Sequence, residues 1–177
     1  MVIRRDLARS KIKMKNNNLQ KGSGLVEILV AVFVFSIVLS SLITASNMYL
    51  SGASDNLKSA KAAYLAQEGI EALKIIRDTN WTTISALTDN ANYYLYFDTS
   101  STTNNTWKAT STMSYATVDS IFTRSFKLNS VYRDANGRIQ SSGTLDNNTE
   151  KVTVSVSWQS KSTTTTKYLS TYITKIF

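Results

Sequence analysis

The chain has 177 residues, enough for one domain with a modest core. It contains no Cys and no His, which excludes disulfides, thiolate metal sites and the commonest general base. Since no pattern of nucleophile and base is recognisable either, we expect a protein that is not an enzyme and that holds no cofactor and no metal.

The positive charge of the chain lies almost entirely at its N-terminus. Residues 1–22 carry seven basic side chains against one acidic side chain, and the rest of the chain contributes only two of the eight net charges. This distribution argues against a basic nucleic-acid-binding surface, and we infer no nucleic-acid partner. A basic segment beside an apolar run instead indicates that residues 1–22 face the cytoplasm and that the following residues are exported.

An apolar run follows the basic segment. Ile28 to Ala45 is an uncharged stretch that is interrupted only by hydroxyl side chains, at Ser36, Ser40, Ser41 and Thr44. A membrane-spanning helix needs about 17–25 residues of this kind, so we predict such a helix over residues 23–46. A conventional signal peptide is an alternative, because "SSLITASNM" contains the small residues of a cleavage region.

Residues 47–80 are predicted to continue the helix with one buried face. They contain no Pro and only two Gly. Small and apolar residues recur at helical spacing along one side, at Ala62, Leu65, Ala66, Gly69, Ile70, Leu73 and Ile76. Such a face is typical of a helix that covers a globular core. Joined to the apolar run, it predicts one helix from about residue 25 to residue 78.

From Trp81 onward the pattern becomes that of strands. Four segments are rich in β-branched and aromatic residues: "YYLYF" (93–97), "SIFTRSFKLNSVYRD" (120–134), "KVTVSVSW" (151–158) and "TKYLSTYITKIF" (166–177). "DANGR" (134–138) contains the Asn-Gly pair of tight hairpins. Residues 98–118 are expected to form an irregular loop, and "SKSTTTT" (160–166) a polar connection. We therefore predict an α+β fold, in which an antiparallel sheet within 81–177 packs on the helix of 47–80.

Two groups of polar and acidic residues are candidate sites. Asp134 and Asn136, with Asp146 and Glu150, could approach one calcium ion, but the full calcium-loop pattern is not met. Two polar turns are the simpler interpretation. Glu68 and Glu71 lie three residues apart on the predicted helix, and without His or a metal partner they are interpreted as part of a solvated face.

Two further patterns give weaker candidates. Three triplets match the acceptor pattern of N-glycosylation: Asn80-Trp-Thr, Asn104-Asn-Thr and Asn147-Asn-Thr. So short a pattern arises easily in a sequence that is rich in Asn and Thr. The three indoles are interpreted as core or loop anchors rather than as a ligand platform, at Trp81, Trp107 and Trp158.

A specific motif lies where the basic segment meets the apolar run. The residues "KGSGLVE", Lys21 to Glu27, resemble the class III signal of type IV prepilins and pseudopilins. The resemblance implies a cut directly after a Gly that leaves Glu as the fifth mature residue, and this register selects Gly22 over Gly24. It further implies that Ser23 is the methylated N-terminal residue and that Glu27 forms an assembly salt bridge with the amine of another subunit. The segments 62–81 and 152–177 are also similar to minor pilins.

The resemblance implies a structural role. We expect a pilin-like fold and a minor pilin or pseudopilin of a type IV pilus or type II secretion-like filament. The leader 1–22 would lie in the cytoplasm, residues 23–46 in the cytoplasmic membrane, and residues 47–80 and 81–177 in an exported domain. The expected partners are other pilin subunits, a prepilin peptidase and the assembly machinery, and the final location is a cell-surface, periplasmic or extracellular filament. The alternative is a single-span, membrane-anchored domain that binds an extracellular ligand and does not polymerise.

Overall fold

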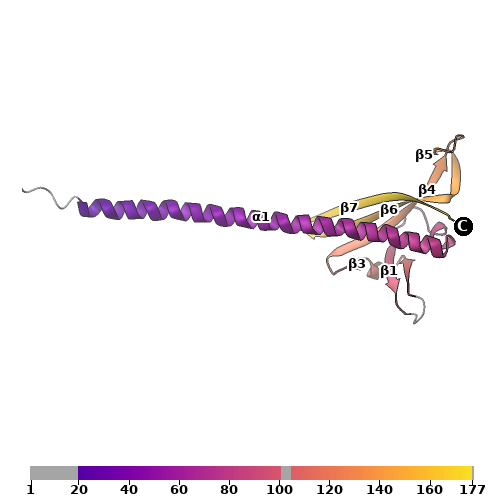
Figure 1. Cartoon of the computed structure of the whole chain (residues 1–177), viewed down its shortest axis with the longest axis horizontal. Helices are drawn as coiled ribbons and strands as arrows, with labels where there is room; N and C mark the ends of the chain where they lie inside the picture. Colours follow the sequence, from indigo (N-terminus) through magenta and orange to yellow (C-terminus); the bar gives the residue numbers. More distant parts are fainter. Residues whose placement is uncertain (1–19, 101–104, 177) are drawn as a thin grey trace, which may run out of the picture. The chain divides into compact units, whose positions relative to one another are not determined.

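The computed structural model describes residues 20–100 and 105–176 (Figure 1). Most of the predicted leader, residues 1–19, lies outside the described residues. The chain divides into two units, residues 1–52 and residues 53–177. All the strands that the structure describes lie in the second unit.

One helix, α1 (Gln20–Thr79), runs through the first unit and into the second. Its 60 residues contain no Pro, which is the residue that would interrupt the backbone hydrogen bonds. The helix ends where the Asn80 N–H donates to the Ile76 carbonyl at 2.9 Å, and a short helix, α2 (Thr82–Ser85), follows Trp81. The prediction of one helix across residues 25–78 is confirmed.

Two antiparallel sheets follow the helices. The smaller sheet pairs β1 (Tyr94–Asp98) with β2 (Thr106–Thr110). The larger sheet has the order β3-β4-β6-β7, with β5 also paired to β4, and its strands are β3 (Thr117–Val118), β4 (Phe122–Arg133), β5 (Ile139–Gln140), β6 (Thr144–Ser160) and β7 (Thr163–Thr174). A short 3-10 helix (Met113–Tyr115) precedes β3. The predicted α+β class, with a long helix packed on an antiparallel sheet, is confirmed.

The core of the second unit forms between α1 and the larger sheet. All seven positions of the predicted helix face are buried, and Ala72 is buried beside them. The alternation of residues 151–158 is confirmed as well, because the apolar side chains of this segment face the core. The register sets Phe126 of β4 opposite Val154 of β6, and both side chains are completely buried. Tertiary packing of this face, rather than helix propensity alone, therefore stabilises α1 in this unit.

Gly69 allows α1 to approach the sheet closely. A Cβ atom at position 69 would lie 3.0 Å from Cγ1 of Val154 and 3.5 Å from Cδ of Arg124. Closely packed interiors tolerate added atoms poorly, so a bulky side chain here would push the helix and β6 apart. Gly in a helix interior costs about 1 kcal/mol relative to Ala, and close packing offsets that cost.

The prediction of an irregular loop over 98–118 was wrong. This segment contains β2, the 3-10 helix and β3. Trp107 of β2 pairs with Phe97 of β1, and their rings meet edge to face with centroids 5.5 Å apart. Trp107 also packs against the core, so one large side chain anchors a strand whose other residues are mostly polar.

The prediction of a polar connection over 160–166 was also wrong in its length. β6 ends at Ser160 and β7 begins at Thr163, so the turn consists of Lys161 and Ser162, with φ 56° at Lys161. The threonines that follow pair with β6 as a strand. Their side chains are mostly exposed, so β-branching rather than apolar burial favours the strand there.

The hairpin predicted at "DANGR" forms with a longer loop than the tight Asn-Gly turn. The Gly137 N–H donates to the Asp134 carbonyl at 3.0 Å, and the Asp134 N–H donates to the Arg138 carbonyl at 2.9 Å. Gly137 has φ 77°, whereas Asn136 keeps a negative φ. This is a three-residue hairpin loop that ends in a left-handed glycine.

Polar contacts mark the start of the second unit on α1. The Ser160 hydroxyl donates to the Asp55 carboxylate at 2.8 Å. The Lys167 ammonium donates to the carbonyl and the hydroxyl of Ser59 at 3.1 and 2.9 Å. The apolar core begins after these contacts, at Ala62.

Candidate functional site: the N-terminal part of α1

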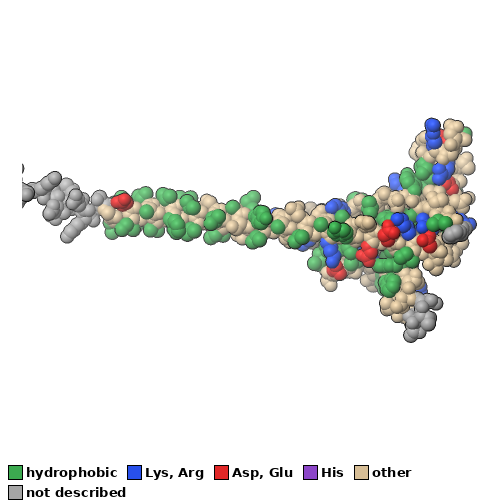
Figure 2. All heavy atoms as spheres, in the orientation of Figure 1, with side chains coloured by type: hydrophobic (Ala, Val, Ile, Leu, Met, Phe, Trp, Pro, Cys, Tyr) green, Lys and Arg blue, Asp and Glu red, His purple; other side chains and the backbone are tan. Residues whose placement is uncertain are grey.

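The apolar side chains of α1 in the first unit are exposed on every side of the helix. From Leu25 to Ile43 the exposed fractions of the large apolar side chains lie between 42% and 67%. Figure 2 shows hydrophobic side chains along this part of α1, while most charged side chains lie on the second unit. Among the described residues, α1 is the one helix long and apolar enough to cross a membrane. A surface of this size indicates contact with lipid or with other apolar helices.

The hydroxyl groups within this apolar surface are satisfied by the helix itself. Each donates to the carbonyl four residues earlier, at 2.7 Å for Ser36 and at 2.9 Å for Ser40, Ser41 and Thr44. An unsatisfied polar group in hydrocarbon costs several kcal/mol, which these bonds avoid. The four polar interruptions therefore do not disqualify the segment as a membrane span.

Glu27 is the exception to this apolar character. Its side chain is exposed, and the next charged residue along the chain is Asp55. A carboxylate within a lipid-facing helix costs about 2.5–3.5 kcal/mol on insertion scales, or less when it reaches the interfacial water. The Glu27 carboxylate therefore costs free energy in lipid unless it has a charged partner or lies at the membrane edge.

The other predicted site residues lie just before Glu27. Gly22 and Ser23 belong to the first turns of α1, and only their backbone is described. The partner predicted for Glu27 is the amine of a second mature chain. The cleavage, the methylation and the salt bridge therefore stay predictions.

A buried arginine is the main polar feature that the sequence pattern did not indicate. Arg124 of β4 is only 4% exposed, and its guanidinium lies 3.1 Å from the Glu68 carboxylate and 5.3 Å from the ring centroid of Trp107. It also donates to the Leu65 carbonyl at 3.4 Å. Burial lowers the pKa of Arg124, and the charge of Glu68 opposes that shift. The contacts join α1, β4 and β2, which is a structural role.

This contact revises the interpretation of the two helix glutamates. Glu71 pairs with Lys74 at 2.8 Å on the exposed side of α1, as expected of a solvated face. Glu68 instead pairs with a buried charge, although half of its own side chain meets solvent. Trp158 is a buried core residue, and Trp81 and Trp107 pack against the core, as predicted for anchors.

The four candidate calcium ligands do not converge on one point. The Asp134 carboxylate accepts the N–H groups of Asn136 and Arg138 in its own turn. The Asp146 carboxylate accepts from Nε of Arg133 at 2.7 Å, which lowers the pKa of Asp146. Within residues 20–100 and 105–176, no group of three or more His, Cys, Asp or Glu side chains could hold a metal ion.

Comparison with known proteins gives one match, at this N-terminal site. A family profile described as the prokaryotic N-terminal methylation motif matches residues 17–43. This is the class III signal motif of type IV prepilins, and the matched range contains Gly22, Ser23 and Glu27. No curated protein and no solved structure matches the chain. The match confirms the resemblance seen at Lys21 to Glu27.

Proposed function

We propose that this type IV pilin-like, membrane-anchored protein is a minor pilin or pseudopilin, a structural subunit of a type IV pilus or type II secretion-like filament. In this proposal a prepilin peptidase cuts between Gly22 and Ser23, and the mature chain enters the filament through the N-terminal part of α1. The chain itself catalyses nothing. Cleavage, N-methylation of Ser23 and the energy for assembly come from other proteins.

The observation that carries the proposal is the position of Glu27. It is the single charge between Lys21 and Asp55, at the start of a helix whose apolar side chains are exposed all round. Two unit charges about 4 Å apart attract by about 4 kcal/mol at an effective dielectric near 20. Pairing with the Ser23 amine of a neighbouring subunit would therefore fix the axial register of two helices. The apolar side chains alone cannot do so, because their packing is not directional.

The topology of the proposal follows from the charge of the leader. Seven basic residues precede the apolar segment, so the leader stays in the cytoplasm and α1 crosses the cytoplasmic membrane once. The second unit then lies outside. Before assembly, lipid covers the apolar side chains of α1, and after assembly neighbouring helices cover them.

Replacement of Glu27 by Gln tests the proposal directly. The change should spare membrane insertion and cleavage but lower incorporation into filaments at least tenfold, because removing one partner of a buried ion pair costs about 3–5 kcal/mol. The measurement is the ratio of filament-bound to membrane-bound protein. Glu71→Gln, which removes an exposed charge of the second unit, is the matched control and should leave the ratio unchanged.

An unchanged ratio for Glu27→Gln would favour the alternative, a tethered domain that does not polymerise. N-terminal sequencing of protein extracted from membranes or filaments distinguishes the filament subunit from the tethered domain independently. The proposal expects a mature chain that begins at Ser23, whereas a plain anchor keeps Met1. A chain that begins after Ala45 would indicate a conventional signal peptide.

A further inference from the structure

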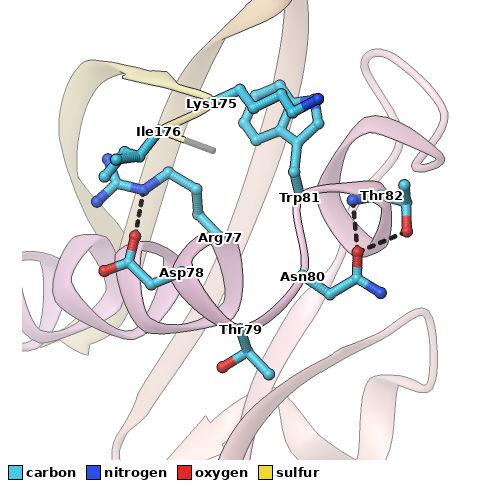
Figure 3. A pocket seen from close by; sticks show the side chains of 8 residues that line it. All are labelled: Arg77, Asp78, Thr79, Asn80, Trp81, Thr82, Lys175 and Ile176. Atoms are coloured by element: carbon cyan, nitrogen blue, oxygen red, sulfur yellow. Dashed lines mark hydrogen bonds and ion pairs between the residues drawn. The ribbon is translucent and has the colours of Figure 1, made fainter.

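A hollow of about 320 Å³ lies at the C-terminal end of α1 (Figure 3). Residues 77–82 line one side of it, and Lys175 and Ile176 line the other. One of the three N-glycosylation triplets of the sequence, Asn80-Trp81-Thr82, forms part of this lining. Asn80 and Trp81 lie between two helices, since α1 ends at Thr79, and Thr82 is the first residue of α2.

The side chains of this triplet are held in one arrangement. Oδ1 of Asn80 accepts the Thr82 N–H at 3.0 Å and the Thr82 hydroxyl at 2.7 Å. Figure 3 shows the amide nitrogen of Asn80 pointing away from both contacts. Asn80 and Thr82 are exposed, while Trp81 between them packs against the core and fixes the turn. The side chain of Asn80, whose nitrogen a glycan would join, is therefore exposed on a turn that two hydrogen bonds hold.

The other two triplets differ from this one. Thr149 of the triplet at Asn147 is only 1% exposed, and its hydroxyl lies 3.5 Å from Arg133 and 3.3 Å from Thr174. That triplet lies in β6, and its Thr149 pairs with Thr174 of β7. Asn104 lies outside the described residues. The fold thus separates Asn80 from Asn147, although the sequence pattern treats them alike.

We propose that Asn80 is a glycan acceptor, modified by a transferase that uses a lipid-pyrophosphate-linked oligosaccharide. In this reaction a bond forms between Nδ2 of Asn80 and C1 of the first sugar, and the bond between C1 and the phosphate oxygen breaks. The lipid pyrophosphate leaves, and one amide proton passes to a base of the transferase. The two donors on Oδ1 stabilise the negative charge that this oxygen gains as Nδ2 loses its proton.

A neighbouring residue and the proposed topology both bear on this acceptor. Asp78 precedes Asn80 by two residues and pairs with Arg77 at 2.8 Å, and half of its side chain is exposed. A transferase that binds this segment can therefore also contact a carboxylate two residues before the acceptor. The inference rests on the topology of the proposed function, which places the second unit on the exported side of the membrane, where lipid-linked glycans are presented to translocated chains.

Mass spectrometry of the full chain, purified from its native membranes, tests the inference. Trypsin leaves Asn80 and Asn104 on one peptide, residues 78–108, so a second cleavage before Asp89 is needed to separate them. The expected result is a glycan mass on the peptide 78–88 and none on the peptide that contains Asn147. N80Q and T82A should remove that mass, while T82S should keep it, because Ser retains the hydroxyl.

An unmodified peptide 78–88 from the native protein would overturn the inference, and so would a mass that persists in N80Q. N147Q is the matched control and should leave the glycan in place. Protease accessibility of the second unit in intact cells or spheroplasts tells the two proposals apart. If the unit is outside and Asn80 is bare, the modification fails alone, whereas a unit that faces the cytoplasm overturns the proposed topology together with the modification.

Discussion

Both parts of α1 carry apolar side chains that need to be covered, and the two parts differ in what covers them. Residues 24–52 expose large apolar side chains on every side, whereas residues 53–79 bury one face against the sheet and expose the other. Both parts are continuous helix, so helix propensity does not distinguish them. The sheet of the same chain therefore covers the apolar face of the second part. The first part depends on lipid or on another protein to cover its apolar side chains.

The largest test of this comparison is to separate the two parts. A fragment that begins at residue 47 should be soluble, with both helix and sheet in its circular dichroism spectrum, because its core is complete without residues 24–46. The full chain should need detergent. A fragment that is unfolded or purely helical would contradict the comparison, since the second part would then also depend on something outside the domain.

The next test compares two leucines of α1 in this fragment. Leu73 is completely buried and Leu57 is exposed. Leu73→Ala should lower the free energy of unfolding by about 2–5 kcal/mol, because it leaves a cavity in the core. Leu57→Ala should change it by less than about 0.5 kcal/mol. Denaturant unfolding measures both, and equal effects would show that burial does not determine the stability of this helix.

Two glycines of α1 sharpen the comparison further. Gly69→Leu should destabilise the fragment by about 1–3 kcal/mol, because the new side chain overlaps Val154. Gly52→Leu should be neutral or slightly stabilising, since nothing lies within 4 Å of a Cβ atom there and Leu favours the helix. Thermal unfolding of the two variants checks this order. A Gly69→Leu variant as stable as the wild type would rule out the close packing of α1 on β6.

The last difference concerns pH, which should change the stability of the second unit. Between Ile28 and Ser54 no charged residue is present, whereas burial, followed by the charges of Asp89 and Asp146, raises the pKa of Glu150 to about 7. The pKa of a Glu in the unfolded chain is lower, about 4.3. Protonated Glu150 therefore favours the folded state, and its contribution is lost as the pH rises through 7.

The expected loss between pH 5 and pH 8 is about 2 kcal/mol, allowing for partial solvent exposure of this side chain. Glu150→Gln should flatten the dependence of the unfolding temperature on pH in this range and should raise stability at pH 8. Asp146 acts in the opposite direction, because its lowered pKa contributes stability that is lost only as the pH falls into the acid range. A wild-type profile that does not fall between pH 5 and pH 8 would contradict the burial of Glu150.

Elements with a regular apolar period were predictable from the sequence. The face from Ala62 to Ile76 and the alternating strand 151–158 were found because burial on one side leaves a periodic pattern. β2 and the start of β7 were missed because their exposed sides are rich in Thr and carry little apolar pattern. For the same reason, the predicted connection over 160–166 is longer than the actual turn at 161–162.

The candidate site could be predicted from the sequence, whereas the polar contacts within the domain could not. The motif at Gly22, Ser23 and Glu27 is local, so it can be read directly along the chain. The Arg124–Glu68 contact joins residues far apart in sequence, and no local pattern predicts it. A charged residue at an inward position between Phe122 and Phe126 was the one available signal, and it requires the register of β4 to be known first.

The polar contacts at the start of the second unit also have a mechanical consequence. Tension applied along α1 from its N-terminal side reaches the second unit first at Asp55 and Ser59. Asp55 is hydrogen-bonded to Ser160, and Ser59 is hydrogen-bonded to Lys167. These few bonds carry the load before the apolar contacts from Ala62 onward do. Under rising force these hydrogen bonds should therefore break before the apolar core opens, so the contacts at Asp55 and Ser59 would shield the fold behind them.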